Sequence, residues 1–250
     1  MSVNEKTEQL RALLSRATRV TALTGAGISA ESGIPTFRGP EGLWNNYRPE
    51  DLATPDAFAR DPELVWRWYD WRRGIVAKAR PNAAHRGLAM LERDQAVTVI
   101  TQNVDGLHAA AGSRELIELH GNIWKVRCTS CALIAANTDV PLAVIPPRCG
   151  RCGAVVRPHI VWFGEAVDPY DFQRSVEMSR SADVFLVIGT SGVVQPAASL
   201  ANLAKSAGAT VVEINPDPTP ITAVASLVFH ERATQVFESL GEHGTSSFYQ

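Results

Sequence analysis

The fold is decided by residues 20–39, VTALTGAGISAESGIPTFRG. Residues 20–24 form a short apolar run with β-branched side chains, which predicts a buried strand. The run breaks at Gly25-Ala26-Gly27, and residues 28–31 have the pattern of a helix's opening turn. A strand, a glycine turn and a helix together present backbone N–H groups and a positive helix end to a pyrophosphate. The stretch predicts a dinucleotide site, and the alternative is a tight turn that needs glycine only for its backbone angles.

The glycine spacing fits the dinucleotide fingerprint variant G-x-G-x-x-A, with Ala30 in the last position. A dehydrogenase of this type also carries an acidic residue about 20 positions further on, at the end of a second strand. Residues 40–47, PEGLWNNY, contain no apolar strand that could position such a residue. The pattern therefore favours a protein that binds the dinucleotide for chemistry other than hydride transfer.

The composition is that of an ordinary globular protein. A chain of 250 residues, 45% hydrophobic and 20% charged, fits one α/β domain with an inserted module. The net charge of −2 gives no electrostatic case for a nucleic-acid partner. No apolar run reaches the length of a membrane span, and the N-terminus lacks the apolar core of a signal peptide. We expect a soluble, cytoplasmic protein without a membrane partner; the oligomeric state is open, with a monomer favoured.

Three further apolar runs lead into small polar residues. Residues 96–101 precede Gln102, Asn103 and Asp105, residues 182–188 precede Gly189, Thr190 and Ser191, and residues 209–214 precede Asn215. In open α/β sheets the ligand lies beyond the carboxyl ends of the strands. These residues therefore predict the rim of one nucleotide crevice. The alternative for residues 102–105 is a set of turn residues that cap the next helix.

The four cysteines form two C-x-x-C pairs, Cys128 with Cys131 and Cys149 with Cys152. Their spacing matches the C-x₂-C-x₁₅₋₂₀-C-x₂-C pattern of a zinc ribbon. In a reducing compartment such pairs favour a metal over disulfides. Four thiolates fill a tetrahedral site, so we expect one structural zinc ion per chain, without an open position for water or substrate.

Helical periodicity marks residues 8–19, 62–78 and 85–93, and residues 115–119 predict a strand that runs into His120. On the second helix Tyr69 and Arg72 are three residues apart and share one face; the alternative is a half-buried tyrosine beside a solvated arginine. Residues 157–165 carry apolar side chains that we expect to stay exposed, which suits pairing with an extended peptide. The alternative is a plain connecting strand. Residues 241–250 read as a loose tail.

Taken together, these motifs resemble the sirtuin family of NAD-dependent protein-lysine deacylases, of bacterial type, over nearly the whole chain. The resemblance rests on residues 25–29, 33–38, 101–108, 119–121, 189–191 and 213–215 and on the four cysteines. It implies a Rossmann-like parallel-sheet domain from residues 1–40, 84–123 and 158–250. It also implies a helical insertion at 41–83 with the acyl-selectivity residues and a zinc-ribbon module at 124–157. NAD and an acylated-lysine protein would meet in the cleft between the domains.

The resemblance also implies roles for single residues. His120 would act as general base, while Asn103 and Asp105 hold the nicotinamide ribose and carboxamide. The residues implied in NAD binding are Gly25, Ala26, Gly27, Ser29, Ala30, Phe37, Arg38, Gln102, Asn103, Asp105, Gly189, Thr190, Ser191, Asn215 and Ala233. The products would be nicotinamide, free lysine and O-acyl-ADP-ribose. Without the resemblance, His120 would be read as a strand-end histidine with a packing role.

Ala53-Thr54-Pro55 together with Tyr69-x-x-Arg72 resembles the class III branch of that family, whose members remove succinyl and malonyl groups. The substrate residues implied are Ala53, Tyr69, Arg72, Val161, Phe163 and Gly164. An acidic chain that enters an apolar channel loses its hydration, and an unpaired buried charge is costly. Arg72 can bind the carboxylate with two parallel bonds, and Tyr69 can donate a further hydrogen bond. Small Ala53 leaves room for both side chains.

Three other classes of protein remain as alternatives. A mono-ADP-ribosyltransferase would need the same residues to expose the ribose carbon. A non-catalytic module that binds NAD or acylated peptides would not need His120, Asn103 and Asp105. A redox dehydrogenase is the weakest alternative because the acidic residue of the second strand is missing.

Overall fold

The structure, a computed structural model, describes residues 1–37 and 48–242. Within them lies a six-stranded parallel sheet in the order β3-β2-β1-β7-β8-β9. Its strands are β1 (Arg19–Thr24), β2 (Ala96–Thr101), β3 (Leu116–Glu118), β7 (Val184–Ile188), β8 (Thr210–Ile214) and β9 (Leu227–Phe229). The order runs outward in both directions from β1, which is the arrangement of Rossmann-like dinucleotide-binding domains.

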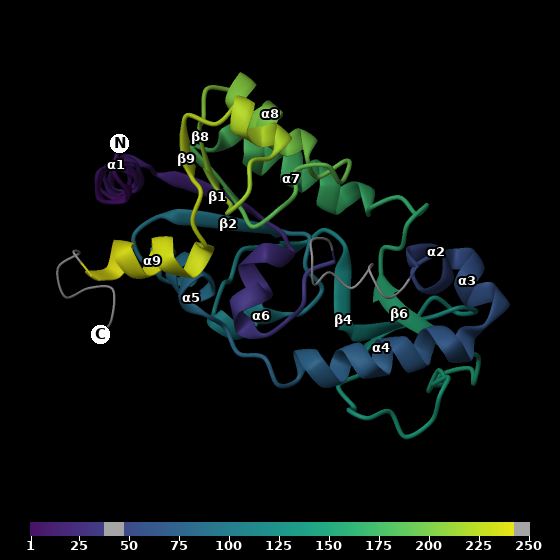
Figure 1. Cartoon of the computed structure of the whole chain (residues 1–250). Helices are drawn as coiled ribbons and strands as arrows, with labels where there is room; N and C mark the ends of the chain where they lie inside the picture. Colours follow the sequence, from purple (N-terminus) through teal and green to yellow (C-terminus); the bar gives the residue numbers. More distant parts are fainter. Residues whose placement is uncertain (38–47, 243–250) are drawn as a thin grey trace.

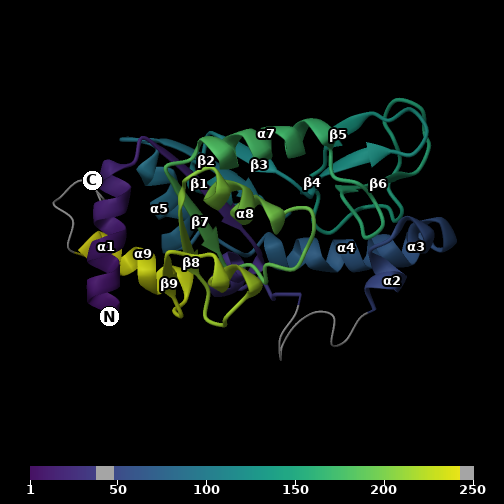
Figure 2. The same cartoon turned by 90° about the horizontal axis from the view of Figure 1, so that it is seen from above.

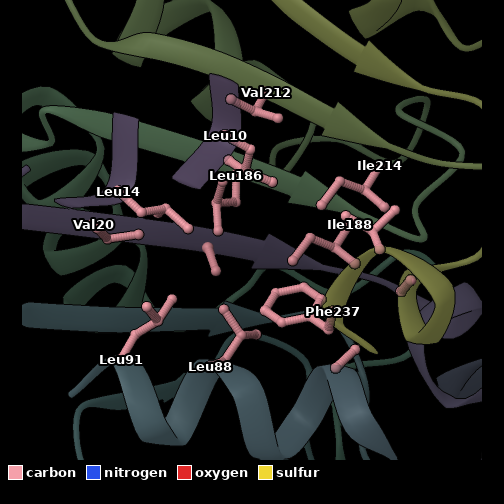
Figure 3. Close-up of a cluster of buried hydrophobic side chains, with 14 of the residues drawn as sticks. Leu10, Leu14, Val20, Leu88, Leu91, Leu186, Ile188, Val212, Ile214 and Phe237 are labelled. Atoms are coloured by element: carbon pink, nitrogen blue, oxygen red, sulfur yellow. The ribbon is translucent and has the colours of Figure 1, made fainter. Parts of the chain in front are cut away.

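Helices cover both faces of this sheet (Figure 1). One face carries α1 (Val3–Arg16), α5 (Ala83–Leu91) and α9 (Ala233–Glu242), and the other carries α7 (Pro169–Ser181) and α8 (Ser199–Ser206). Successive strand residues serve the two faces alternately, as Ala22 and Leu23 of β1 do. In Figure 3 Leu10, Leu14, Leu88, Leu91 and Phe237 point from the helices toward Val20, Leu186 and Val212 of the sheet. Burial on both faces explains the near-continuous apolar runs of these strands.

A smaller lobe lies at one end of the molecule, opposite α1 and α9 (Figures 1 and 2). It combines α2 (Pro49–Leu52), α3 (Pro55–Arg60) and α4 (Pro62–Val76) with an antiparallel sheet of β4 (Gly121–Cys128), β5 (Ile134–Ala136) and β6 (Val156–Ile160). Helices and sheet share one core, in which Trp66 and Tyr69 of α4 pack with Ile123 and Val156. Strands β4 and β6 cross the expected boundaries at 123/124 and 157/158, so the division into three units stays a prediction.

Short segments complete the larger domain: the 3₁₀-helices η1 (Ala26–Ser32) and η3 (Pro220–Ala223), and α6 (Leu107–Ala111). The helix predicted over 62–78 is confirmed and ends two residues early, with Asp61 accepting the Leu64 N–H as its N-cap. The helix predicted over 8–19 begins earlier, at Val3, because Ser2 and Glu5 form a capping box. It ends at Arg16, since residue 19 already belongs to β1. No helix of the described residues is both long and apolar enough to cross a membrane.

Candidate functional site

Four neighbouring strands end at the same level of the parallel sheet. Thr24 lies opposite Thr101 on one side and Ile188 on the other, and Ile188 lies opposite Ile214. The residues that follow these strands are therefore neighbours, as predicted: Gly25, Gln102, Gly189 and Asn215. Hydrogen bonds connect these strand ends. The Gln102 backbone N–H donates to Thr24 O at 2.9 Å, and the Gln102 side-chain amide donates to the Thr190 hydroxyl at 3.0 Å.

The glycine corner is built by close contact between two backbones. Gly27 N–H donates to Gly189 O at 2.8 Å, and a Cβ atom on Gly27 would lie 2.8 Å from the Gly189 Cα. Gly189 has φ +59°, where a side chain is strained, and its Cβ would lie 2.4 Å from Ile28 N. The expected opening turn of an α-helix is instead the 3₁₀-helix η1, which ends at Ser32 and is capped by Gly33 with φ +85°. The Gly27 N–H is used within the protein and is therefore not free for a pyrophosphate.

Asp105, Asn103 and Ser29 form one hydrogen-bonded cluster beside this corner. The Asn103 amide donates to Gly25 O at 3.0 Å and to Ser29 Oγ at 3.2 Å. Ser29 Oγ in turn donates to Asp105 Oδ2 at 2.9 Å, while Leu107 N–H donates to Asp105 Oδ1 at 2.8 Å. Burial raises the pKa of Asp105, and these two donors oppose that shift. The cluster fixes the direction of a carboxylate and an amide at the edge of the sheet.

His120 follows β3 and faces the same edge. Its Nδ1 lies 3.1 Å from Gln102 O, and a carbonyl oxygen can only accept, so Nδ1 carries the ring proton. Nε2 of the neutral ring is then an unprotonated acceptor. Burial lowers the pKa of His120, and the bond to Gln102 partly offsets this. A neutral imidazole with an unprotonated Nε2 can act as a general base near neutral pH.

His85 belongs to the same cluster, although the sequence predicts only a helix over 85–93. Its Nε2 lies 3.4 Å from Ser29 Oγ and its Nδ1 lies 2.9 Å from Asn82 Oδ1. The ring is fully buried and packs on His108 with 4.8 Å between centroids. Burial lowers the pKa of His85 to about 4. One sequence signal indicates where the His85 ring is held: Asn82 lies three residues before His85, and the pair forms a capping box at the start of α5.

Helix α4 supplies the other side of the site, with Tyr69 and Arg72 both buried at 2% and 6% exposure. The Arg72 guanidinium lies 4.7 Å from the ring centroid of Phe37 and 4.9 Å from that of Trp68. Among the described residues, the ion pairs within 4.0 Å do not include Arg72. Burial lowers the pKa of Arg72, and the charges of Tyr69 and Asp105 oppose this. The alternative of a solvated arginine is therefore wrong.

Trp162 connects α4 to the segment that follows β6. Its Nε1 donates to Tyr69 Oη at 2.9 Å, which leaves the Tyr69 hydroxyl proton for another acceptor. Phe163 N–H donates to the carbonyl of Ala53, the C-cap of α2, at 3.0 Å. Phe163 is 48% exposed, as expected for this segment, and Gly164 is exposed with φ +86°. Val161 is half-buried, whereas Ile160 and Trp162 are buried at 9% and 3% exposure, so the expectation of an exposed apolar segment is wrong for Ile160 and Trp162.

The four cysteines lie together beside β4, with all Sγ atoms within 4.8 Å of one another. Sγ atoms of Cys131 and Cys149 are 3.7 Å apart. Sulfurs around a tetrahedral zinc ion, at Zn–S of about 2.3 Å, are about 3.8 Å apart, so the set fits zinc. Amide N–H groups of Cys131 and Ser130 point at Cys128 Sγ from 3.4 Å and lower its pKa to about 6. Those donors favour the thiolate that binds metal.

A sequence model of the Sir2 family matches residues 25–196. The chain is 56% identical over 216 residues to a protein of Aquifex aeolicus named NAD-dependent protein deacylase, covering 86% of this chain and 90% of that one. It is 56% identical over 227 residues to NAD-dependent protein deacylase 1 of Caldanaerobacter subterraneus, covering 90% and 94%. The chain belongs to the Sir2 family, the sirtuins.

Solved structures of other Sir2 proteins have the same fold as this sirtuin. A Sir2 homolog in complex with NAD is 50% identical, with a TM-score of 0.89 over 94% of this chain and 93% of that chain. A Sir2 complex with deacetylated p53 peptide and 3'-O-acetyl ADP ribose is 34% identical, with a TM-score of 0.88 over 95% and 98%. The predicted Rossmann-like α/β fold with a cysteine-bearing module is thus confirmed.

The remaining predicted residues of this sirtuin lie around the same sheet edge, with one outside the described part. Thr190 is buried, Ser191 and Ala30 are exposed, and Asn215 is half-buried. Ala233 is buried at the start of α9, and Ala26 opens η1. Arg38 lies outside the described residues. Glu213, just before Asn215, is a buried carboxylate that accepts from the hydroxyls of Thr219 and Thr222 and so anchors η3 beside the edge.

Proposed function

We propose that this sirtuin is an NAD-dependent protein-lysine deacylase that converts NAD and an acylated lysine into nicotinamide, free lysine and O-acyl-ADP-ribose. The observation that carries the proposal is the position of His120. Its Nδ1 proton is held by Gln102 O, on the strand end that also carries Asn103 and Asp105. The names of the relatives and the NAD complex of a similar structure support the same activity.

In this proposal NAD is a substrate that lies along the edge of the parallel sheet. Its contacts come from Gly25, Ala26, Gly27, Ser29, Ala30, Phe37, Arg38, Gln102, Asn103, Asp105, Gly189, Thr190, Ser191, Asn215 and Ala233. The pyrophosphate lies against the glycine corner, where the lack of side chains lets it approach the backbone without using the Gly27 N–H, and the adenosine end lies toward Asn215 and Ala233. The polar cluster of Asn103 and Asp105 holds the nicotinamide ribose and carboxamide, so that the bond from C1′ to nicotinamide is exposed.

The chemistry then proceeds in two stages. The acyl oxygen of the substrate attacks C1′, the bond to nicotinamide breaks, and nicotinamide leaves with the bonding electron pair. Nε2 of His120 accepts the proton of a ribose hydroxyl, and the 2′-oxygen attacks the amidate carbon. The proton held by His120 passes to the lysine nitrogen, the bond from that nitrogen to the former amidate carbon breaks, and lysine leaves. Water then adds to this carbon, the bond from the carbon to the 1′-oxygen breaks, the 1′-oxygen takes a proton from the added water, and O-acyl-ADP-ribose is released. The cysteine cluster holds one zinc ion with a structural role and takes no part in these steps.

We further propose that this sirtuin is a deacetylase that also removes the acidic acyl groups succinyl and malonyl, and that the acidic groups are preferred. The support is a guanidinium, that of Arg72, buried between two rings without a carboxylate partner among the described residues. A carboxylate at the end of the acyl chain would pair with Arg72 and accept the free Tyr69 proton. Val161, Phe163, Gly164 and Ala53 would line the approach of the acylated peptide.

Mass spectrometry of the products tests both proposals. Purified protein is given NAD and matched peptides that carry acetyl-, malonyl- or succinyl-lysine. We expect nicotinamide and O-acyl-ADP-ribose in equal amounts, with the acidic acyl groups turned over fastest. ADP-ribose attached to protein without O-acyl-ADP-ribose would identify a mono-ADP-ribosyltransferase, and binding of NAD without nicotinamide release would identify a non-catalytic module.

We also propose that the protein is a monomer, that it is located in the cytoplasm and that its partners are acylated-lysine proteins.

A further inference from the structure

Arg73, the neighbour of Arg72 on α4, is fully buried and points toward the small sheet instead of the acyl side. Its Nε donates to Ile123 O at 2.9 Å. Its two terminal nitrogens donate to the side-chain and backbone oxygens of Asn137, both at 2.6 Å. The guanidinium lies 5.6 Å from the ring centroid of Trp66 and 5.7 Å from that of Trp124. Arg73 therefore joins α4 to β4 at residues 123 and 124.

These two residues of β4 hold the loop that carries Asp105. Ile123 N–H donates to Val104 O at 2.8 Å, and Trp124 Nε1 donates to Asp105 O at 2.9 Å. Two successive carbonyl groups of the loop are thus fixed from β4. The next residue, Gly106, has φ +79°, and a Cβ there would lie 3.3 Å from Trp124 Cδ1, so the ring also lies against the turn of the loop.

We propose that Arg73 and Trp124 are positioning residues that set the direction of the Asp105 carboxylate toward NAD. The inference rests on the proposed function, in which Asp105 contacts the nicotinamide half of NAD. The Asp105 side chain is held by Ser29 and Leu107, and its peptide group is held by Trp124. If the bond from Trp124 is lost, the peptide group can rotate and the carboxylate moves with it. Arg73 acts one step further away, by fixing the strand to which Trp124 belongs.

The chain contains a matched control for this bond. Trp66 Nε1 also donates to a backbone carbonyl, that of Val156, at 2.7 Å, and its ring also contacts Arg73. Val156 belongs to β6 of the small sheet, and this bond does not involve the loop of residues 102–106. Changing either tryptophan to phenylalanine keeps a ring beside Arg73 and leaves one carbonyl without its donor. A general loss of stability should therefore appear in both variants.

The experiment compares Trp124→Phe and Trp66→Phe with the parent protein. We expect both variants to stay folded, to retain zinc and to unfold at a similarly lowered temperature. Only Trp124→Phe should lose kcat/KM for NAD, about tenfold or more, because small displacements of a substrate-binding group are costly. Calorimetry with NAD, without acylated peptide, should show weaker binding to Trp124→Phe alone. KM for the acylated peptide should stay at the parent value.

Two outcomes would overturn the inference. One is parent-like NAD kinetics and NAD affinity in Trp124→Phe, and the other is an equal loss of both quantities in Trp66→Phe. A parent protein that binds NAD but never releases nicotinamide would instead overturn the proposed function. In that case the calorimetric comparison still decides whether Trp124 positions the NAD site.

Discussion

The sheet edge and the α4 side of the site are held in place by different interactions. At the edge, polar side chains bond to one another and to backbone groups, as Asp105, Asn103 and His120 do. On α4, the charge of Arg72 is flanked by the rings of Phe37 and Trp68 and has no carboxylate partner among residues 1–37 and 48–242. The hydrogen bonds of the edge are thus in place before a substrate binds, whereas Arg72 has no ion pair within 4.0 Å among the described residues and interacts with the charge of Asp105 only from a greater distance. The two sides should respond differently to mutation and to the acyl group.

The largest expected effect is that of His120→Tyr, which acts on the sheet edge. Loss of a general base costs about 10²–10⁴-fold in rate, and it should do so equally for acetyl- and succinyl-lysine peptides. His230→Tyr, a change of the same kind at an exposed position, should retain the parent rate. Steady-state kinetics, with zinc content and melting temperature as controls for folding, check the result. A variant with parent activity would remove His120 from the mechanism.

Arg72→Met changes the α4 side of the site and should lower kcat/KM for succinyl-lysine much more than for acetyl-lysine. Loss of a charge-assisted pair costs about 1.5–3 kcal/mol, so kcat/KM for succinyl-lysine should fall about tenfold or more while that for acetyl-lysine survives. Arg67→Met is the control, because Arg67 lies exposed on the same helix and pairs with Glu63. Equal losses on both peptides would mean that Arg72 has a structural role and would remove the difference between the two sides.

Gly27→Ala tests whether the glycine corner depends on backbone contact. The added Cβ would lie 2.8 Å from Gly189 Cα and O, and overpacking of this kind costs about 1–3 kcal/mol. Gly74→Ala is the control, since a Cβ at that helical position meets nothing within 4 Å and should stabilise by about 0.5–1 kcal/mol. Denaturant unfolding measures both free energies. An unchanged stability of Gly27→Ala would show that the two backbones can separate at little cost.

Acidic pH should lower the free energy of unfolding, because two buried histidines, His85 and His108, resist protonation in the folded protein. The pKa of His85 is lowered to about 4 and that of His108 to about 3, both by burial. Between pH 6.5 and about 4 the unfolded chain binds protons that the folded protein does not, so the free energy of unfolding falls as pH falls. The expected slope is about 1.4 kcal/mol per pH unit for each histidine. Denaturant unfolding of the parent and His108→Asn between pH 7 and 5 should show a shallower slope in the variant, and identical slopes would contradict it.

Much of the larger domain follows from local pattern. The runs that become β1, β2, β7 and β8 are apolar because both faces of the sheet are buried, and their polar ends meet because parallel strands in register end together. The cysteine spacing likewise predicts a four-sulfur cluster that the structure confirms. In contrast, the sequence does not predict that His85 and Trp162 belong to the site. Their side chains meet Ser29 and Tyr69 across the fold, and no spacing along the chain encodes those contacts.

The positions of the strands, the glycine corner, the cysteine ligands and the family can all be predicted from the amino-acid sequence, because each depends on residues that are close together in the chain. The hydrogen bonds and ring contacts that these residues make become visible in the three-dimensional fold. In the folded chain the Gly27 N–H donates to Gly189 O, the ring proton of His120 lies on Nδ1, and the adjacent Arg72 and Arg73 contact different groups. These outcomes depend on which distant groups occupy the neighbouring space, since a hydrogen bond or a ring contact exists only once the partner is packed beside it.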